Sequence, residues 1–320
     1  MADPVIAIDA MGGDRAPGEI VAGARQAAEA GYEVVLVGDP AAVGDTGGVP
    51  VVPASETVGM AEDPARAVRT KKDSSLVRAA EAVRDGKADA MVSAGNTGAA
   101  MAAALFRMGR VKGVARPAIA TVIPVPGASP TVLLDSGANV ECSPAWLLQF
   151  AQMGAVFSRV RCGVALPRVG LLSIGEEPEK GSPLVKEAHR LISGARGFEF
   201  VGNVEGRDLM SDAADVVVTD GFTGNVALKA LEGAMKFAFG AVVGALRSPG
   251  VGSSALDALM PLAAEMDPDS HGGAVLLGVD GVCVISHGSS SSRAIVSAVG
   301  VADRAVREGL VSLLADAVAA

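Results

Sequence analysis

The chain alternates short, almost continuously apolar runs with longer amphipathic runs over its whole length. The short runs consist mainly of Val, Ile, Leu and Ala, which is typical of strands that are covered on both faces. The longer runs place their apolar residues at helical spacing. This alternation predicts an α/β protein built on a doubly wound, mostly parallel sheet with helices on both faces.

The runs can be assigned individually. The short ones are predicted as strands at residues 5–8, 33–37, 90–92, 118–123, 131–134, 168–172, 199–201, 216–218 and 282–285. The longer ones are predicted as helices at 19–30, 74–84, 99–108, 146–157, 183–192, 226–246 and 302–317. Because no Ser- or Pro-rich linker and no repeat divides the 320 residues, we expect a single domain over residues 1–320, with a short helical or loop excursion near 246–271.

The balance of charged residues excludes one class of partner. The chain has 27 Lys and Arg against 36 Asp and Glu, a net charge of −9, and 3% aromatic residues. It therefore lacks the basic surface and the stacking platforms that nucleic acids require, and no nucleic acid partner is expected. A small anion needs only local positive potential and is compatible with this composition.

The N-terminal residues do not resemble a targeting segment. Asp3, Asp9 and Asp14 interrupt the region where a signal peptide has a basic start and an unbroken apolar run. A membrane-spanning helix needs about 20 apolar residues, and the longest apolar stretches of this chain are shorter. The three cysteines are far apart and form no C-x-x-C pair, which favours a reducing compartment. We therefore expect a cytoplasmic protein.

Polar and glycine-rich segments follow many of the predicted strands. Ligands of open α/β sheets bind outside the carboxyl ends of strands, glycine allows close backbone approach, and helix N-terminal amides favour anions. Together these features predict a phosphate or similar anion held by main-chain N–H groups. No dinucleotide or nucleoside triphosphate motif appears, so no cofactor is expected. The segments are residues 9–14, 93–98, 135–139, 175–181, 219–225 and 286–290.

Covalent catalysis finds little support in the sequence. There is no G-x-S-x-G motif, and Cys142, Cys162 and Cys283 are interpreted as small buried hydrophobic residues. His287 lies at a predicted strand end, where a hydrogen-bonded turn residue and a ligand contact are both open interpretations.

A metal site is not expected either. Asp212, Asp215 and Asp220 are close in sequence, but a hard-metal site requires ligands that converge in space. Helix caps and solvated turn carboxylates are the favoured interpretation of all three.

A set of segments, in order and covering nearly the whole chain, together resembles one family: the phosphate acyltransferases of fatty-acid and phospholipid synthesis. Each segment alone would be weak, but the set is highly specific. The segments are IDAMGGDRAPGEIVAGA (8–24), KKDSSLVRAA (71–80), VSAGNTGA (92–99), ARPAIATVIP (115–124), LLDSGANVEC (133–142), LLSIGEEPEKG (171–181), GNVEGRDLM (202–210), DVVVTDGFTGNVALKALEG (215–233), GGAVLLG (272–278) and SHGSS (286–290).

The resemblance implies a reaction and a fold. Inorganic phosphate would attack the thioester of a fatty acyl chain on acyl carrier protein, giving acyl phosphate for phospholipid synthesis and free carrier protein. Phosphate is itself the nucleophile, so no Ser or Cys is required. The implied fold is Rossmann-like and related to isopropylmalate dehydrogenases and phosphotransacetylases. The implied assembly is a homodimer without a cofactor.

The resemblance also implies site residues. Lys180 is predicted to stabilise charge, and Asn225 to orient phosphate or the oxyanion, as the two catalytic residues. The predicted substrate- and phosphate-binding residues are Asp9, Gly12, Gly13, Gly95, Asn96, Thr97, Asn139, Gly224, His287, Gly288 and Ser289.

Three other functions remain open at this point. The first is a phosphotransacetylase that moves an acyl group between coenzyme A and phosphate. The second is an NAD-dependent decarboxylating dehydrogenase, suggested only by analogy of fold. The third is a catalytically silent scaffold for carrier protein or membrane enzymes.

The chain departs from the family pattern in a segment implicated in membrane association. Residues 248–270 contain no Lys or Arg, whereas the family segment is longer and often basic. Asp257, Glu265, Asp267 and Asp269 make the segment acidic, so we expect at most weak or purely apolar contact with a membrane surface. Other departures are Ser136, His271, Val275, Ser291 and Arg293.

Carrier docking should use basic residues, because carrier proteins of this kind are acidic. Arg107, Arg110, Lys112 and Arg116 form the densest basic stretch of the chain and are the candidate docking surface. A solvated helix end is the alternative interpretation of the same stretch.

Overall fold

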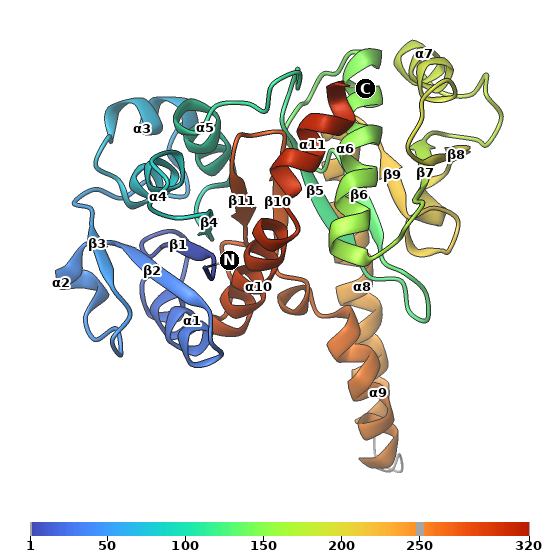
Figure 1. The fold of residues 1–320 in the computed structure, drawn as a ribbon. Helices are drawn as coiled ribbons and strands as arrows, with labels where there is room; N and C mark the ends of the chain where they lie inside the picture. Colours follow the sequence, from blue (N-terminus) through green and yellow to red (C-terminus); the bar gives the residue numbers. More distant parts are fainter. Residues whose placement is uncertain (1, 248–252, 320) are drawn as a thin grey trace.

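The structure, a computed structural model, describes residues 2–247 and 253–319. Its strands form one sheet in the order β3-β2-β1-β4-β11-β10-β5-β6-β9-β7-β8 (Figure 1). The strands are β1 Val5–Asp9, β2 Glu33–Gly38, β3 Val51–Pro53, β4 Ala90–Ser93, β5 Ala118–Ile123, β6 Thr131–Leu134, β7 Arg168–Leu172, β8 Glu199–Val204, β9 Val216–Val218, β10 Ala274–Leu277 and β11 Val282–Ile285.

Helices connect most of these strands, and several begin at a side chain that caps the first turn. Asn96, Asp220 and Ser291 each accept a hydrogen bond from the third backbone N–H of the helix that follows. The helices are α1 Gly18–Glu29, α2 Pro40–Val43, α3 Pro64–Thr70, α4 Ser75–Arg84, α5 Thr97–Arg107, α6 Pro144–Cys162, α7 Pro183–Ile192, α8 Gly221–Leu246, α9 Ser253–Met266, α10 Ser292–Arg307 and α11 Leu310–Ala319, with 3-10 turns η1 Gly206–Met210 and η2 Pro268–Ser270.

The sheet is covered on both faces. In β1, Ile6 and Ile8 belong to a core shared with α1, α6 and α10, while Ala7 belongs to a second core shared with α4 and α5. All three side chains are fully buried. Successive residues of a strand point to opposite faces, so two cores explain why the run is apolar without alternation. The predicted α/β fold with a mostly parallel sheet is confirmed.

The sheet reverses direction at its centre. Strand β10 is antiparallel to both β11 and β5, and β5 is antiparallel to both β10 and β6. The strands on either side of this centre are parallel to their own neighbours. The carboxyl ends of β1, β4 and β11 therefore lie at one edge, and those of β6, β7 and β9 at the opposite edge. The polar strand ends are divided between the two edges.

The structure differs from the sequence-based expectation near the C-terminus. Residues 302–317, predicted as one helix, span the end of α10 and most of α11, and α10 begins ten residues earlier than predicted. The two helices are separate because Gly309 between them has a φ of +67° that ends the first helix. Strand β10 was not predicted, since its segment is short and begins with Gly272 and Gly273. The short edge strand β3 was also missed.

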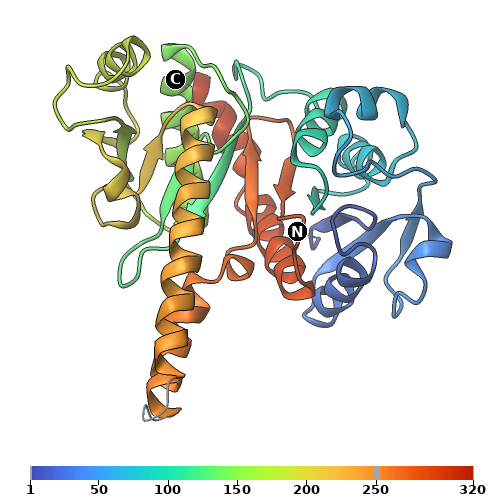
Figure 2. The same cartoon turned by 180° about the vertical axis from the view of Figure 1, so that it is seen from behind.

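Helices α8 and α9 extend away from the body of the molecule as a hairpin (Figures 1 and 2). Only Gly221 and Gly224, in the first turn of α8, are buried in that helix. The excursion expected near 246–271 corresponds to the outer part of this hairpin and η2, except for residues 248–252, which lie outside the described residues. None of the described helices combines the length and the apolar character that crossing a membrane requires.

Candidate active site

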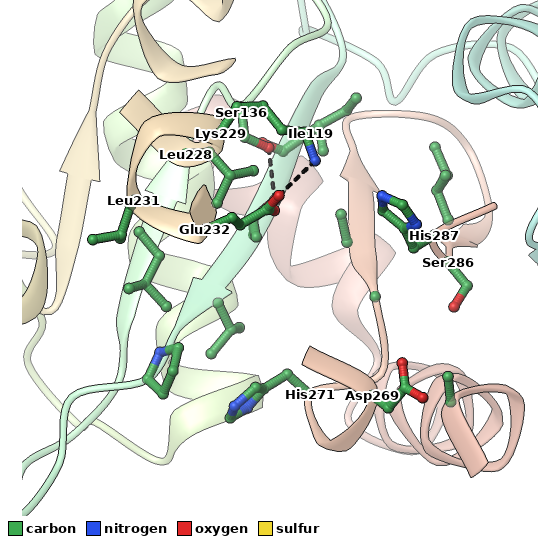
Figure 3. A pocket seen from close by; sticks show the side chains of 18 of the residues that line it. Ile119, Ser136, Leu228, Lys229, Leu231, Glu232, Asp269, His271, Ser286 and His287 are labelled. Carbon is green, nitrogen blue, oxygen red and sulfur yellow. Dashed lines mark hydrogen bonds and ion pairs between the residues drawn. The ribbon is translucent and has the colours of Figure 1, made fainter. Parts of the chain in front are cut away.

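A cavity of about 240 Å³ lies over the three central strands where the direction reverses (Figure 3). Its floor includes Thr121 of β5, Ala274 of β10 and Ile285 of β11. These residues are neighbours across the sheet, since Ala274 pairs with Ile285 and Val275 pairs with Ala120. The cavity therefore opens on a face of the sheet, between the two groups of strand-end loops.

One face of α8 forms a long wall of this cavity. The lining residues Asn225, Leu228, Lys229, Glu232 and Met235 recur at the spacing of one helical face. From Asn225 to Met235 the helix advances by ten residues, a length of about 15 Å at 1.5 Å per residue. The cavity thus follows the helix for nearly three turns.

The two ends of the cavity differ in chemistry. Near the start of α8 the lining groups include Asn225, Ser136 and Thr121, and the Thr121 and Ser136 hydroxyls are 2.7 Å apart. Toward the hairpin the walls include the apolar Pro124 and Met235, together with Asp269 and His271, whose side chains bond the Ser291 hydroxyl and the Glu265 carbonyl. In Figure 3 the labelled Ser136 and Ile119 lie at one end, His271 and Asp269 at the other, and His287 at the side.

A buried carboxylate organises the loop after β6. Asp135 is fully buried and accepts hydrogen bonds from the backbone N–H groups of Ile119, Gly137, Ala138 and Asn139 at 2.7–3.1 Å. The Asn139 side-chain amide donates to the same carboxylate at 2.9 Å and to the Pro117 carbonyl at 2.8 Å. Because the main-chain donors converge on one side chain, the loop conformation depends on Asp135.

Glycines allow the first turn of α8 to lie against this loop. A Cβ at Gly224 would be 1.9 Å from the Asp135 carbonyl oxygen, and one at Gly221 would be 2.7 Å from the Asn139 backbone. No other residue fits without moving the helix. The close approach brings Asn225 over Gly137, whose hypothetical Cβ is 3.6 Å from the Asn225 Oδ1 atom. The structure thus brings together the predicted residues Asn139, Gly224 and Asn225.

A second buried carboxylate lies at the opposite edge, after β1. Asp9 accepts a 2.7 Å hydrogen bond from the Ser93 hydroxyl, which in turn accepts one from the Gly95 N–H. A Cβ at Gly12 would be 2.4 Å from the Asp9 carboxylate and 2.9 Å from the Gly95 nitrogen. Burial raises the pKa of Asp9, against the lowering effect of hydrogen bonds from serine hydroxyls and backbone N–H groups.

The other predicted residues of this edge join the same cluster. The Asp14 N–H donates to the Gly288 carbonyl at 2.8 Å, and a Cβ at Gly13 would be 3.2 Å from that oxygen. Asn96 caps α5 and donates to the Met60 carbonyl at 2.8 Å. The exposed His287 ring bonds the Ser289 hydroxyl at 2.8 Å.

Thr97 and His287 of this cluster line the cavity, and Asn225 lines it from the other side. Two helix N-termini therefore border one space, α5 through Thr97 and α10 through Ala294, and the second turn of α8 borders it through Asn225. Backbone N–H groups and helix dipoles make such ends favourable for anions. These helix ends are therefore candidates for binding an anion in an acidic chain.

Lys180 lies outside the cavity wall. It belongs to the exposed Glu-rich turn after β7, and its side chain packs beside Gly175, where a Cβ would be 2.9 Å from the lysine Cγ. Because β7 is the direct neighbour of β9, this turn is at the same sheet edge as the start of α8. The catalytic role of Lys180 stays a prediction.

The cysteines and the acidic cluster have structural surroundings. Burial is the main cause that raises the pKa values of Cys142 and Cys283 to about 12, so neither thiol is a ready nucleophile. Asp212 and Asp215 both bind the Arg168 guanidinium, at 2.6 and 3.0 Å, and Asp220 caps α8. These roles agree with the structural interpretation of the three carboxylates. No group of His, Cys, Asp or Glu residues suited to a metal was found among the described residues.

Sequence reasoning missed several residues of the site. Asp135 was not selected, although it follows a predicted strand directly and stands inside one of the family-like segments. Thr121 lies within a strand, where no local pattern marks it as a lining residue. Asp269 and His271 line the cavity from the segment between α9 and β10, whose path cannot be deduced from one chain's sequence.

Solved structures with this fold define the class of protein. A phosphotransacetylase from Streptococcus pyogenes aligns over 96% of this chain and 94% of its own with a TM-score of 0.65 at 16% identity. A 4-hydroxythreonine-4-phosphate dehydrogenase from Klebsiella pneumoniae aligns over 94% and 98% with a TM-score of 0.55 at 14% identity. At these identities the likeness shows the fold alone: the Rossmann-like α/β fold of phosphotransacetylases and related dehydrogenases.

Sequence relatives identify the family. A family model described as "Fatty acid synthesis protein" matches residues 5–313. A phosphate acyltransferase from Desulforudis audaxviator is 49% identical over 97% of this chain and 95% of the relative, and one from Nostoc punctiforme is 47% identical over 94% and 92%. The chain belongs to this family of phosphate acyltransferases, as the sequence segments predicted.

The raised pKa of Asp9 generates a prediction about pH. The folded state binds the Asp9 proton more tightly than the unfolded chain, so the stability due to this proton is present below the ordinary pKa of 3.8 and is lost as pH rises through the raised value. Asp9→Asn removes this titration. We therefore expect the melting temperature of the variant, relative to the parent, to be higher at pH 7 than at pH 4.

The measurement is the melting temperature of the parent and of Asp9→Asn by thermal unfolding between pH 4 and pH 7. The same substitution at the exposed Asp316 is the control for the general effect of replacing a carboxylate with an amide. A difference for Asp9→Asn that is constant, or that falls with rising pH, would contradict the raised pKa.

Proposed function

We propose that this protein transfers a fatty acyl group from acyl carrier protein to inorganic phosphate and releases acyl phosphate for phospholipid synthesis. The proposal combines the family membership of the chain with one structural observation. That observation is the cavity bordered by the N-termini of α5 and α10, by the Asn225 amide, and by apolar side chains along its length. A phosphate and an acyl thioester need these two environments next to each other.

The chemistry requires positioning and charge stabilisation more than a protein nucleophile. A phosphate oxygen attacks the thioester carbon, a C–O bond forms, and the C–S bond breaks. The proton of hydrogen phosphate ends on the departing thiolate, which gives the free thiol of the carrier. Holding the two reactants together lowers the barrier by about 7–11 kcal/mol, and one oxyanion donor contributes about 2.7–4 kcal/mol.

Asn225 is the proposed donor because its amide is at the polar end of the cavity and its backbone is fixed by the close approach of Gly224 to Asp135. Lys180 is proposed as the cation that balances the charge of phosphate, reaching the reactants from the neighbouring turn. Thr97 and the His287–Ser289 segment are proposed to bind phosphate, since they are at the helix N-termini across the cavity.

A coenzyme A thioester is the alternative acyl donor, favoured by the phosphotransacetylase-like fold. The reaction at the thioester carbon is the same for both donors. They differ in what lies beyond the pantetheine arm, which is a nucleotide in one case and a folded acidic protein in the other.

Release of free thiol from a long-chain acyl carrier protein tests the function. We expect release to require inorganic phosphate, and Lys180→Ala and Asn225→Ala each to lower kcat about 10²–10³-fold, the usual effect of removing one stabilising group. Lys186→Ala and Lys236→Ala, at exposed lysines that do not line the cavity, are the matched controls and should retain activity.

Each other outcome has a definite meaning. Phosphate-dependent release that survives both substitutions would keep the reaction and reject the two residues. Release from acyl coenzyme A alone would favour the alternative donor. Absence of release from either donor would reject the proposed function.

We further propose that the carrier docks beside Arg116. Of the basic stretch named above, Arg107 is 3.6 Å from Glu81, and Arg110 donates to the Ala115 carbonyl, so both have partners within the protein. Arg116 is exposed and stacks on Trp146, with its guanidinium carbon 5.0 Å from the ring centroid. It immediately precedes Pro117, whose carbonyl accepts from Asn139 of the Asp135 loop.

Charge reversal tests this docking site. We expect Arg116→Glu to raise KM for acyl carrier protein about fivefold, equivalent to roughly 1 kcal/mol for an exposed ionic contact, and to leave kcat unchanged. KM for acyl coenzyme A should not change. Arg196→Glu, at an exposed loop residue before β8, is the control. Equal KM values for the parent and Arg116→Glu with the carrier would reject this surface.

The family resemblance also supports a homodimer. In the described part of α8, Phe237 is 80% exposed and Val242 is 45% exposed, so this helix presents large apolar side chains to solvent. A second copy of the chain covering this helix would bury them. The mass measured in solution by light scattering should therefore be twice that of the chain.

Contact with a membrane surface is proposed to be weak and apolar. Met260 and Leu262 of α9 are exposed, and the segment 248–270 has no basic residue to attract anionic lipid. In liposome co-sedimentation we expect a small bound fraction that does not fall with added salt. Strong, salt-sensitive binding would contradict this proposal.

A further inference from the structure

We propose that the cavity holds the acyl chain, and that Met235 and Met266 form the end wall that limits its length. This inference rests on the proposed function and adds to it the residues that select among acyl donors. It follows from the shape of the cavity, from the uneven distribution of its polar groups, and from the way the far end is fixed to the body of the molecule.

The shape suits an extended chain. The cavity follows α8 from Asn225 to Met235, about 15 Å of helix, and follows β5 from Ile119 to Pro124 on the opposite side. An alkyl chain entering beside Asn225 would lie along this path toward the hairpin. A compact ligand would leave most of the path unfilled.

The distribution of polar groups sets the orientation of the chain. Asn225 and Ser136 can bind the thioester at one end of the cavity, and Thr97 lines it from the group of strand ends on the other side. A pantetheine arm, which carries amide groups, would need hydrogen-bond partners along the whole path. The two charged groups on the wall between the two ends, Lys229 and Glu232, pair with each other at 2.8 Å. The rest of this wall is largely apolar, and its apolar members are Ile119, Val122, Ile123, Leu228, Leu231, Ala274 and Ile285.

The end wall combines both arms of the hairpin. Met235 comes from α8 and Met266 from the last residue of α9, and both side chains line the cavity and are partly buried. Methionine is unbranched and fills irregular apolar space, which suits the end of a pocket for flexible chains.

The segment after Met266 is bound to the body of the protein, so the position of the wall is defined. Asp267 pairs with Arg293, and Asp269 accepts a hydrogen bond from the Ser291 hydroxyl. The His271 ring bonds the Glu265 carbonyl at 2.8 Å. These contacts link the end of α9 to the start of α10, which itself borders the cavity through Ala294.

The test is the profile of kcat/KM for phosphate-dependent thiol release against acyl chain length, from short to long saturated chains on carrier protein. Met235→Ala and Met266→Ala should shift the profile toward longer chains, and Met235→Trp toward shorter ones. Each methylene gained or lost should change kcat/KM about fourfold near the length limit, and short chains should be unaffected by the alanine variants.

Met260→Ala is the matched control, because Met260 is on the same helix as Met266 but is 61% exposed and does not line the cavity. Met235→Leu, which conserves volume, should keep the parental profile. Thermal unfolding of each variant identifies any loss of activity that comes from misfolding, and opposite shifts for Met235→Ala and Met235→Trp cannot arise from misfolding.

An unchanged profile in the alanine and tryptophan variants would overturn the inference and leave the proposed function intact. Equal loss of kcat/KM at all chain lengths would also overturn it, because the cavity would then hold a part common to all donors. If the parent protein released no thiol with any chain length, the proposed function and this inference would both fall.

Discussion

The reversal of strand direction at β10 and β5 determines where a site can form in this protein. A uniformly parallel sheet would gather all its carboxyl-end loops at one edge. Here two parallel groups with opposite directions meet at the antiparallel centre, so their loops lie at opposite edges. A ligand that touches both groups must extend across a face of the sheet, along the side chains of the central strands. The elongated cavity over Thr121, Ala274 and Ile285 is the result.

Two buried carboxylates stabilise the loops on either side of that centre, and both depend on glycine. Asp135 binds four main-chain N–H groups of its surroundings, and Gly224 lets α8 approach its carbonyl. Asp9 binds Ser93, and Gly12 lets the loop after β1 approach its carboxylate. A buried carboxylate is costly unless its hydrogen bonds are satisfied, so each loop has one favourable arrangement. The helix ends that border the cavity are positioned by these arrangements.

The sequence predicted the elements of this fold better than their assembly. The unbroken apolar run of β1 correctly indicated a strand between two cores, because side-chain alternation is a local property. The division of α10 from α11 needed the backbone conformation of Gly309. Strand direction is not encoded locally, so the two edges could not be foreseen. The site shows the same difference between local and long-range information. The glycines near Asp9 could be selected because they follow a predicted strand directly. Thr121 and Asp269 line the cavity only because distant parts of the chain pack together, which no local pattern indicates.

The acidic segment after α9 is held by an ion pair and a hydrogen bond to residues at the start of α10. Ser291 and Arg293 bind Asp269 and Asp267, respectively. These four side chains therefore form one set of interactions at the start of α10. Carboxylates engaged in this way are drawn toward the body of the protein and not toward anionic lipid, which would repel them. These contacts hold the segment after α9 against the start of α10, beside Asp269 and His271 of the cavity lining.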